Sequence, residues 1–169
     1  MAEIGVTEGV VEKQDSEIIG NLLRMSKVQA RDIMTPRMVI VGIQQGMSVS
    51  EVLESKPGAV FSRLPLYGKD IDDVTGFILR GDLLLAAAQD KGEISVELLR
   101  REIRTIDAET PLSELLEFLL DQRQHILLVT GEYGGTEGLV TLEDVVETLL
   151  GMEIVDELDK VEDMQALAR

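Results

Sequence analysis

The sequence contains no cysteine, no tryptophan and only one histidine, His125. Without cysteine the chain has no disulfide framework, no thiolate nucleophile and no cysteine ligand for zinc or an iron–sulfur cluster. One histidine is too few for a multi-histidine metal centre, and we expect His125 to be structural or exposed. These absences exclude several common classes of metalloprotein and of nucleophilic enzyme.

Basic residues are also scarce, since 16 Lys and Arg stand against 32 Asp and Glu and the net charge is −16. A domain this acidic repels phosphate backbones, so we expect no nucleic-acid partner. The longest apolar runs, such as Leu83–Ala88, are far shorter than the ~20 residues that span a bilayer. The stretch Met1–Val11 lacks the basic-then-apolar order of a signal peptide. We expect this part of the chain to be soluble in a reducing compartment, while a longer parent protein can still carry a membrane span.

The apolar content that is present amounts to 44% of 169 residues and is almost entirely aliphatic, enough for the core of one domain or two small ones. Apolar residues three and four apart predict an N-terminal helix ending near Ser26–Lys27. Pro65 removes a backbone donor from the predicted strand within Val60–Tyr67, which favours an edge position or an irregular start. Further strands are predicted at Met38–Val41, Gly76–Leu79, Ile103–Ile106, Ile126–Val129 and Gly138–Thr141, and further helices after Ser48, at Asp82–Gln89, after Thr110–Pro111 and at Glu143–Leu150.

The chain repeats itself at an interval of about sixty residues. The segment Ser48–Leu53 aligns with Pro111–Leu116, and Thr75–Ile78 aligns with Glu137–Val140. Each unit has the order strand, helix, strand, strand, helix, and is too small to bury both faces of its sheet alone. The sequence therefore predicts an α+β fold of two β-α-β-β-α repeats, packed through their sheets with pseudo-twofold symmetry and a crevice between equivalent strands. We divide the chain into a lead-in and helix (1–27), repeat one (28–90), repeat two (91–151) and an acidic tail (152–169).

Three motifs occur in order along these repeats: RDIMTPRM from Arg31, FSRLPLY from Phe61 and GEYGGTEGLVTLEDVVETLLG from Gly131. With the repeat, they resemble a tandem pair of CBS (cystathionine β-synthase) domains, a Bateman module, of the CorC/cyclin M family. The resemblance covers about Val28–Gly151. Members of this family are linked to Mg2+ and Co2+ transport and are often described as hemolysin-like. The resemblance implies a cytosolic regulatory module that binds an adenine nucleotide and adjoins a domain in the inner or plasma membrane.

Thr141 and Asp144 are the candidate ribose ligands, because they stand where a predicted strand ends and a helix begins. The spacing by itself indicates a capping box. The same hydroxyl and carboxylate also suit the vicinal hydroxyls of a ribose, and the resemblance implies that they hold one; the two roles are compatible. In repeat one, Leu79 replaces the hydroxyl while Asp82 is kept. We therefore expect one competent site per chain.

Arg63 is the candidate phosphate ligand, because its planar donor fork matches phosphate oxygens. The alternative is a surface arginine paired with one of the many acids. Arg37 and Arg80 are weaker phosphate candidates, which we expect to be solvated. The resemblance places Phe61 beside the adenine base and the backbone of Met34–Pro36 at the base end. The complete set of expected nucleotide contacts is Met34, Thr35, Pro36, Phe61, Ser62, Arg63, Leu64, Pro65, Val140, Thr141 and Asp144.

The sequence offers little for catalysis or for a resident metal. It has no Walker loop and no Ser/His/Asp set, and the adjacent Glu143 and Asp144 splay apart on a helix. The acids of the tail could gather Mg2+, but a run of this kind is more often solvated than ligating. We expect no catalytic residue and no protein metal site. The acids considered are Glu153, Asp156, Glu157 and Asp159.

The charge of the chain also bears on its ligand and on the competing hypothesis. An anionic domain disfavours free ATP, so we expect ATP with Mg2+, or the less charged AMP. Exposed apolar residues within Leu83–Ala88 and Asp144–Leu150 predict a homodimer. The alternative function is a dimerisation or interaction scaffold whose nucleotide site is vestigial.

Overall fold

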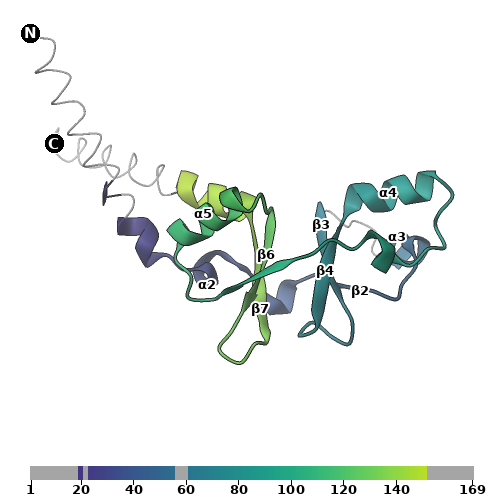
Figure 1. The fold of residues 1–169 in the computed structure, drawn as a ribbon, viewed down its shortest axis with the longest axis horizontal. Coiled ribbons are helices and arrows are strands. Elements are labelled where there is room, and N and C mark those ends of the chain that lie inside the picture. Colours follow the sequence, from purple (N-terminus) through teal and green to yellow (C-terminus); the bar gives the residue numbers. More distant parts are fainter. Residues whose placement is uncertain (1–18, 21–22, 56–60, 152–169) are drawn as a thin grey trace, which may run out of the picture.

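The computed structural model describes residues 19–20, 23–55 and 61–151. They form two lobes, each a β-sheet with helices on its outer face, and the two sheets face each other (Figure 1). The expected start of the N-terminal helix and the acidic tail lie outside the described residues. No helix in the described part of the chain is both long and apolar enough to cross a bilayer.

The two repeats share one topology. Repeat one comprises β2 (Ile43–Gln44), α3 (Val49–Ser55), β3 (Arg63–Tyr67), β4 (Val74–Leu79) and α4 (Arg80–Ala88). Repeat two comprises β5 (Arg104–Asp107), α5 (Leu112–Asp121), β6 (Ile126–Thr130), β7 (Thr136–Thr141) and a helix over 142–151. In each repeat the first strand is parallel to the second and the second is antiparallel to the third. The predicted fold class is confirmed.

Strand alternation explains how each sheet serves two cores. On β6, Leu127 and Val129 pack beneath the helices of repeat two, while Ile126 and Leu128 face the other sheet. Successive side chains of a strand point to opposite faces, so a continuous apolar strand is required wherever both faces are covered. Leu112, Leu115 and Leu119 are buried at helical spacing on α5 and close the outer core.

Each repeat is completed by the segment that precedes the other one. β1 (Thr35–Pro36) pairs with β7 at the edge of the repeat-two sheet, and α2 (Ala30–Ile33) buries Ala30 in the repeat-two core. In return, the 3-10 helix η2 (Val96–Leu99) buries Val96 in the repeat-one core, and Arg101 bridges to Phe77 of β4. Each core therefore contains residues from the segment that precedes the other repeat in the chain.

Two equivalent glycines allow this exchange. A Cβ at Gly138 would lie 2.5 Å from the carbonyl oxygen of Thr35, and a Cβ at Gly76 would lie 2.4 Å from that of Arg101. Both distances are far below contact with backbone that is hydrogen-bonded in place, so any side chain there would push the exchanged segment off the sheet.

One local prediction is wrong. Met38–Val41 is not a strand: the 3-10 helix η1 (Arg37–Val39) covers its first two residues, and the first strand of repeat one is β2. β-branching favours a strand only where a partner strand is available, and this run has none.

For Pro65 the second of the two expected positions, an irregular start of the strand, fits the structure. β3 is the central strand of its sheet, but β2 pairs only from Leu66 onward. Pro65 therefore has β4 alone beside it, and its missing backbone donor is tolerated there.

Candidate functional site

Six of the predicted contacts line two adjoining hollows between the sheets. The first hollow takes Thr35 from β1, Arg63 and Pro65 from β3, and Thr141 from the end of β7, with Phe61 at its mouth. The second shares Phe61, Arg63 and Thr141 and adds Ser62 and Glu143. Residues more than a hundred positions apart thus meet because the exchange of β1 brings Thr35 onto the repeat-two sheet.

The floor and wall of the first hollow are apolar. Ile126 and Leu139 form part of the lining, as do Val39–Val41 from the segment after η1. Phe61 stands at the opening with 56% of its surface exposed. An exposed aromatic ring over an apolar slot offers a flat surface for packing against a planar ring.

Thr141 and Asp144 form the capping box that their spacing predicts. The Thr141 N–H donates to Asp144 Oδ2 over 2.9 Å, and the Asp144 N–H donates to Thr141 Oγ1 over 3.2 Å. The second carboxylate oxygen of Asp144 has no hydrogen-bond partner among the described residues. The cap therefore holds both side chains at the start of the helix while leaving acceptor capacity for a ligand.

Arg63 reaches across from repeat one toward this helix start. Its Nη1 lies 3.4 Å from Glu143 Oε1, and its side chain is 20% exposed, whereas that of Glu143 is 61% exposed. An ion pair this long and this open to water contributes little. The guanidinium is consequently positioned beside Thr141 without a strong competitor for its donors.

Several predicted contacts face elsewhere. The side chains of Leu64 and Val140 are buried in the outer cores of repeats one and two, so only their backbone could meet a ligand. Met34 packs against the repeat-two core. Pro36 is exposed on β1 beside Gly138.

Sequence reasoning missed five apolar lining residues and the partner of Arg63. Val39–Val41 were predicted as a buried strand, so their place in the wall was not expected. Ile126 and Leu139 were placed on predicted strands, but an unbroken apolar run such as Ile126–Val129 does not show which face of the strand meets the crevice. Nothing in the sequence indicated that Glu143 faces Arg63, because 80 positions separate them.

Arg37 is exposed to solvent, as expected, but it also belongs to a junction between the repeats. Its guanidinium donates through both Nη atoms to the carboxylate of Asp72, and the Thr136 N–H donates to Asp72 Oδ1 over 3.1 Å. The hydrogen bond from Arg37 lowers the pKa of Asp72 and raises that of Arg37. Arg80 is exposed and lines neither of the hollows described above.

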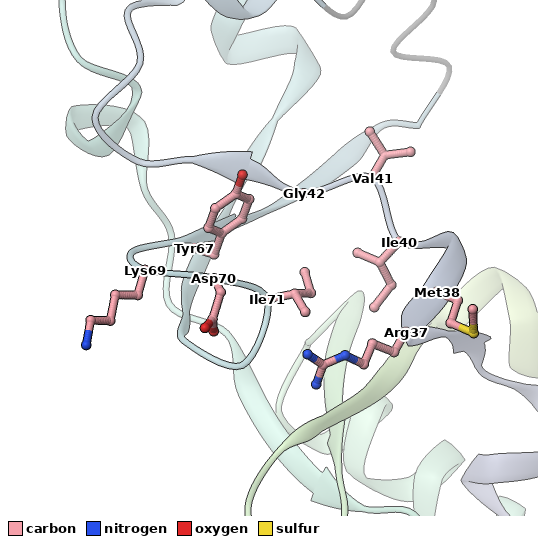
Figure 2. A pocket seen from close by; sticks show the side chains of 9 residues that line it. All are labelled: Arg37, Met38, Ile40, Val41, Gly42, Tyr67, Lys69, Asp70 and Ile71. Carbon is pink, nitrogen blue, oxygen red and sulfur yellow. The ribbon is translucent and has the colours of Figure 1, made fainter.

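A further hollow adjoins this junction on the far side of η1. Figure 2 shows Arg37 reaching toward the turn that carries Asp70 and Ile71, with Tyr67 across the opening. None of the predicted nucleotide contacts lines it. The segment after β1 thus separates two hollows and is pinned between them by the Arg37–Asp72 pair.

Comparison with known proteins shows the family to which this fold belongs. The sequence profile of the CBS domain matches residues 94–151. A UPF0053 protein of Synechocystis is 35% identical over the whole chain, and the magnesium and cobalt efflux protein CorC of Escherichia coli is 27% identical over 155 residues. The chain spans 49% and 53% of these two relatives, about half of their length.

Solved structures extend the likeness to both repeats. The CBS domain of a bacterial CNNM/CorC family Mg2+ transporter in complex with ATP superposes with a TM-score of 0.74 at 30% identity, covering 82% of this chain and 98% of that one. A CBS-domain pair with bound AMP from Klebsiella pneumoniae superposes with a TM-score of 0.61 at 27% identity, covering 73% and 98%. The fold is that of a tandem CBS pair. The chain belongs to the CBS-domain proteins of the CNNM/CorC family, which confirms the resemblance carried by the three motifs.

Proposed function

We propose that this chain is the adenine-nucleotide-sensing module of a CorC-like membrane protein linked to Mg2+ and Co2+ transport, lying at the cytosolic face of the inner or plasma membrane. One observation carries the proposal: the capped Thr141–Asp144 pair, Arg63 and Phe61 converge on one crevice. Support comes from the relative bound to ATP at 30% identity and from the CorC relative described as an efflux protein.

Each part of an adenine nucleotide finds chemistry that suits it in this crevice. The free oxygen of Asp144 accepts a hydrogen bond from a ribose hydroxyl. The hydroxyl of Thr141 forms a second hydrogen bond with the ribose hydroxyls. The apolar slot walled by Val39–Val41 and covered by Phe61 takes the base. Arg63 meets the phosphates with two parallel N–H donors. Glu143 stands beside Arg63, so its negative charge disfavours bare polyphosphate and favours ATP with Mg2+, or AMP.

Binding acts as a switch rather than as catalysis. A ligand shifts a conformational equilibrium only by its differential affinity for the two states. The crevice takes Thr35 and Val39–Val41 from the N-terminal side and Thr141 from repeat two. A nucleotide that binds these groups together stabilises the arrangement in which the exchanged segment is docked, and that segment leads toward the membrane domain of the parent protein.

The experiment is calorimetric titration of the full chain with AMP, ADP and ATP, each with and without Mg2+. Asp144→Asn keeps an oxygen that can accept from the Thr141 N–H but removes the charge, and we expect at least tenfold weaker binding. Asp82→Asn is the matched control, because Asp82 occupies the equivalent position in repeat one beside Leu79. Equal loss in both variants, or no heat from any nucleotide with folded protein, contradicts the proposal and leaves the scaffold hypothesis.

We also propose that the chain forms a homodimer. α4 exposes Leu84 and Leu85, and the helix over 142–151 exposes Val146 and Leu150. These helices occupy equivalent positions in the two repeats, and Figure 1 shows each on the outer side of its own sheet, near the top of the view. Apolar residues gathered on two equivalent helices are typical of an interface between copies of one chain.

A further inference from the structure

The crevice equivalent to the nucleotide site holds a different set of groups. Its position follows from the strand register, in which Leu79 pairs with Arg63 of β3 as Thr141 pairs with Ile126 of β6. Arg101, bridged to Phe77, takes the place that Thr35 holds beside Leu139. A hollow of about 580 Å³ lies there, and the residues that matter in its lining are Arg63, Phe77, Leu79, Arg101, Arg123 and His125.

This second crevice lacks what a ribose needs. Leu79 offers no hydroxyl, and Oδ2 of Asp82 accepts from Nη2 and Nε of Arg101 over 3.1 Å and 3.4 Å, so the charge of this carboxylate is already paired with a cation. In the nucleotide site the equivalent carboxylate, that of Asp144, has no cationic partner among the described residues. A nucleoside therefore finds here no equivalent of the hydroxyl and unpaired carboxylate that Thr141 and Asp144 present.

Guanidinium groups are what the second crevice does offer. Arg63, Arg101 and Arg123 line one hollow with the single acid Glu102, in a chain whose net charge is −16. Arg101 already pairs with Asp82 and Arg63 makes a long contact with Glu143, both outside the lining, so Arg123 is the one without a carboxylate partner among the described residues. Arginine forks bind oxyanions through two parallel N–H donors. The floor beneath them is apolar, because Phe77 is buried and Leu79 half-buried, so ionic contacts made there are shielded from water on one side.

Arg123 has a left-handed backbone conformation, which is unusual for an arginine. It follows the end of α5 at a φ of +50°, in the left-handed region where glycine or asparagine is the usual residue after a helix. A cation near a helix C-terminus is favourable on its own. Arg123 lines the hollow, and no carboxylate pairs with it in the described part of the chain.

Arg63 lines this hollow and both parts of the nucleotide site. We propose that the second crevice is a binding site for a small oxyanion of the phosphate class, and that it competes with the nucleotide site for the guanidinium of Arg63. The competition rests on the proposed function, whereas the anion site does not. Because coupling between two ligands is reciprocal, a nucleotide that engages Arg63 weakens the anion by the same factor.

The first test titrates sodium pyrophosphate into the full chain without nucleotide, at constant ionic strength, following heat and backbone amide shifts. We expect saturable binding that moves the amides of Arg101 and Arg123. Arg123→Gln weakens binding about tenfold, the size of one charge-assisted hydrogen bond. Arg123→Lys, which keeps the charge but loses the fork, falls between. Arg104→Gln, an exposed arginine on β5 that does not line the hollow, is the control and keeps full affinity.

The second test repeats the titration in the presence of ATP with Mg2+. We expect pyrophosphate to weaken nucleotide binding in the native chain. We expect a much smaller effect in Arg123→Gln. A second nucleotide per chain that is lost in Arg123→Gln identifies a nucleotide phosphate as the source of the anion. Absent pyrophosphate binding, or equal affinity in Arg123→Gln, overturns the proposal. So does binding that is lost in Arg63→Gln but kept in Arg123→Gln, since the anion then lies in the nucleotide site. If no nucleotide binds while pyrophosphate still depends on Arg123, the proposed function fails and the anion site stands.

Discussion

At the scale of single residues, the candidate site depends on side chains that serve the fold and leave capacity for a ligand. Thr141 Oγ1 accepts from the Asp144 N–H, and Asp144 Oδ2 accepts from the Thr141 N–H. Both groups are thereby fixed before any ligand arrives, which reduces the entropy lost on binding. In the equivalent pair of repeat one, Leu79 has no hydroxyl and the carboxylate of Asp82 forms an ion pair with Arg101.

The Arg37–Asp72 pair predicts a residue-scale pH dependence of stability. Hydrogen bonding from Arg37 lowers the pKa of Asp72 from its ordinary value of 3.8, with help from the Thr136 N–H. A carboxyl whose folded pKa is depressed stabilises the fold above its unfolded pKa, and this contribution is lost as pH falls through the folded value. The native chain should therefore lose stability relative to Asp72→Asn as pH drops below about 4.

Urea unfolding at a series of pH values measures this effect. We expect Asp72→Asn to unfold at lower urea than the native chain at neutral pH, and the two curves to converge in acid. Asp90→Asn is the control, since Asp90 has a φ of +58°, a conformation that asparagine tolerates well. A difference between native chain and Asp72→Asn that stays constant through the acid range contradicts the account.

At the scale of elements, the exchange of segments between the repeats builds the site. β1 supplies Thr35 to the crevice only because it is added to the repeat-two sheet. The segment that follows, Arg37–Val41, is fixed at one end by β1 and along its side by Asp72. The segment from Ala30 to Val41 therefore connects the repeat-two core with one wall of the candidate site.

Val96→Ala tests the exchange directly. Val96 stands beyond the end of the first covalent repeat but is buried in the core with Leu64, Ile78 and Leu83. Removing two methyl groups from a packed core should cost roughly 1–3 kcal/mol of stability. In methyl NMR spectra the shifts should fall on those repeat-one residues and leave Leu115 and Leu127 of repeat two unchanged. Shifts confined to the repeat-two core would show that the segments are not exchanged.

Prediction from sequence succeeded for elements with strong local signals. It failed where contacts between residues far apart in the chain determine the local structure. The strands predicted at 76–79, 126–129 and 138–141 are confirmed. They could be predicted because each is a short apolar run between residues that interrupt strands. Met38–Val41 was misassigned because β-branching looks the same with or without a partner strand. The tie between Arg37 and Asp72 was hidden for a different reason, since charge pairs 35 positions apart leave no periodic signal.

At the scale of the whole molecule, two sheets share an inner core and leave two unequal crevices. Phe77, Ile126, Leu128 and Leu139 fill the space between the sheets, so the crevices open only at its margins. The predicted nucleotide set is half assembled in the lining of one of them. The remaining members lie outside the lining: Leu64, Val140 and Met34 face the outer cores, Pro36 is exposed on β1, and Asp144 caps the helix start.

The homodimer is tested at this scale. Leu85→Glu with Val146→Glu places charges on both helices proposed as the interface, where the native side chains are 56% and 42% exposed. We expect sedimentation velocity to show a dimer for the native chain and a monomer for the double variant. Tyr133→Glu, in the exposed turn between β6 and β7, is the control and should leave the dimer intact. A double variant that sediments like the native chain would exclude this interface.

The most direct test of the account is to locate a bound nucleotide. Methyl NMR spectra of the full chain are recorded while ATP with Mg2+ is added, and each crevice has its own reporters. The account predicts saturable shifts at Ile40, Ile126 and Leu139, which line the crevice of Thr141, before any shift at Leu79, which lines the other. Shifts that appear first at Leu79, or no shifts at all, would contradict the claim that this chain senses an adenine nucleotide through Thr141 and Asp144.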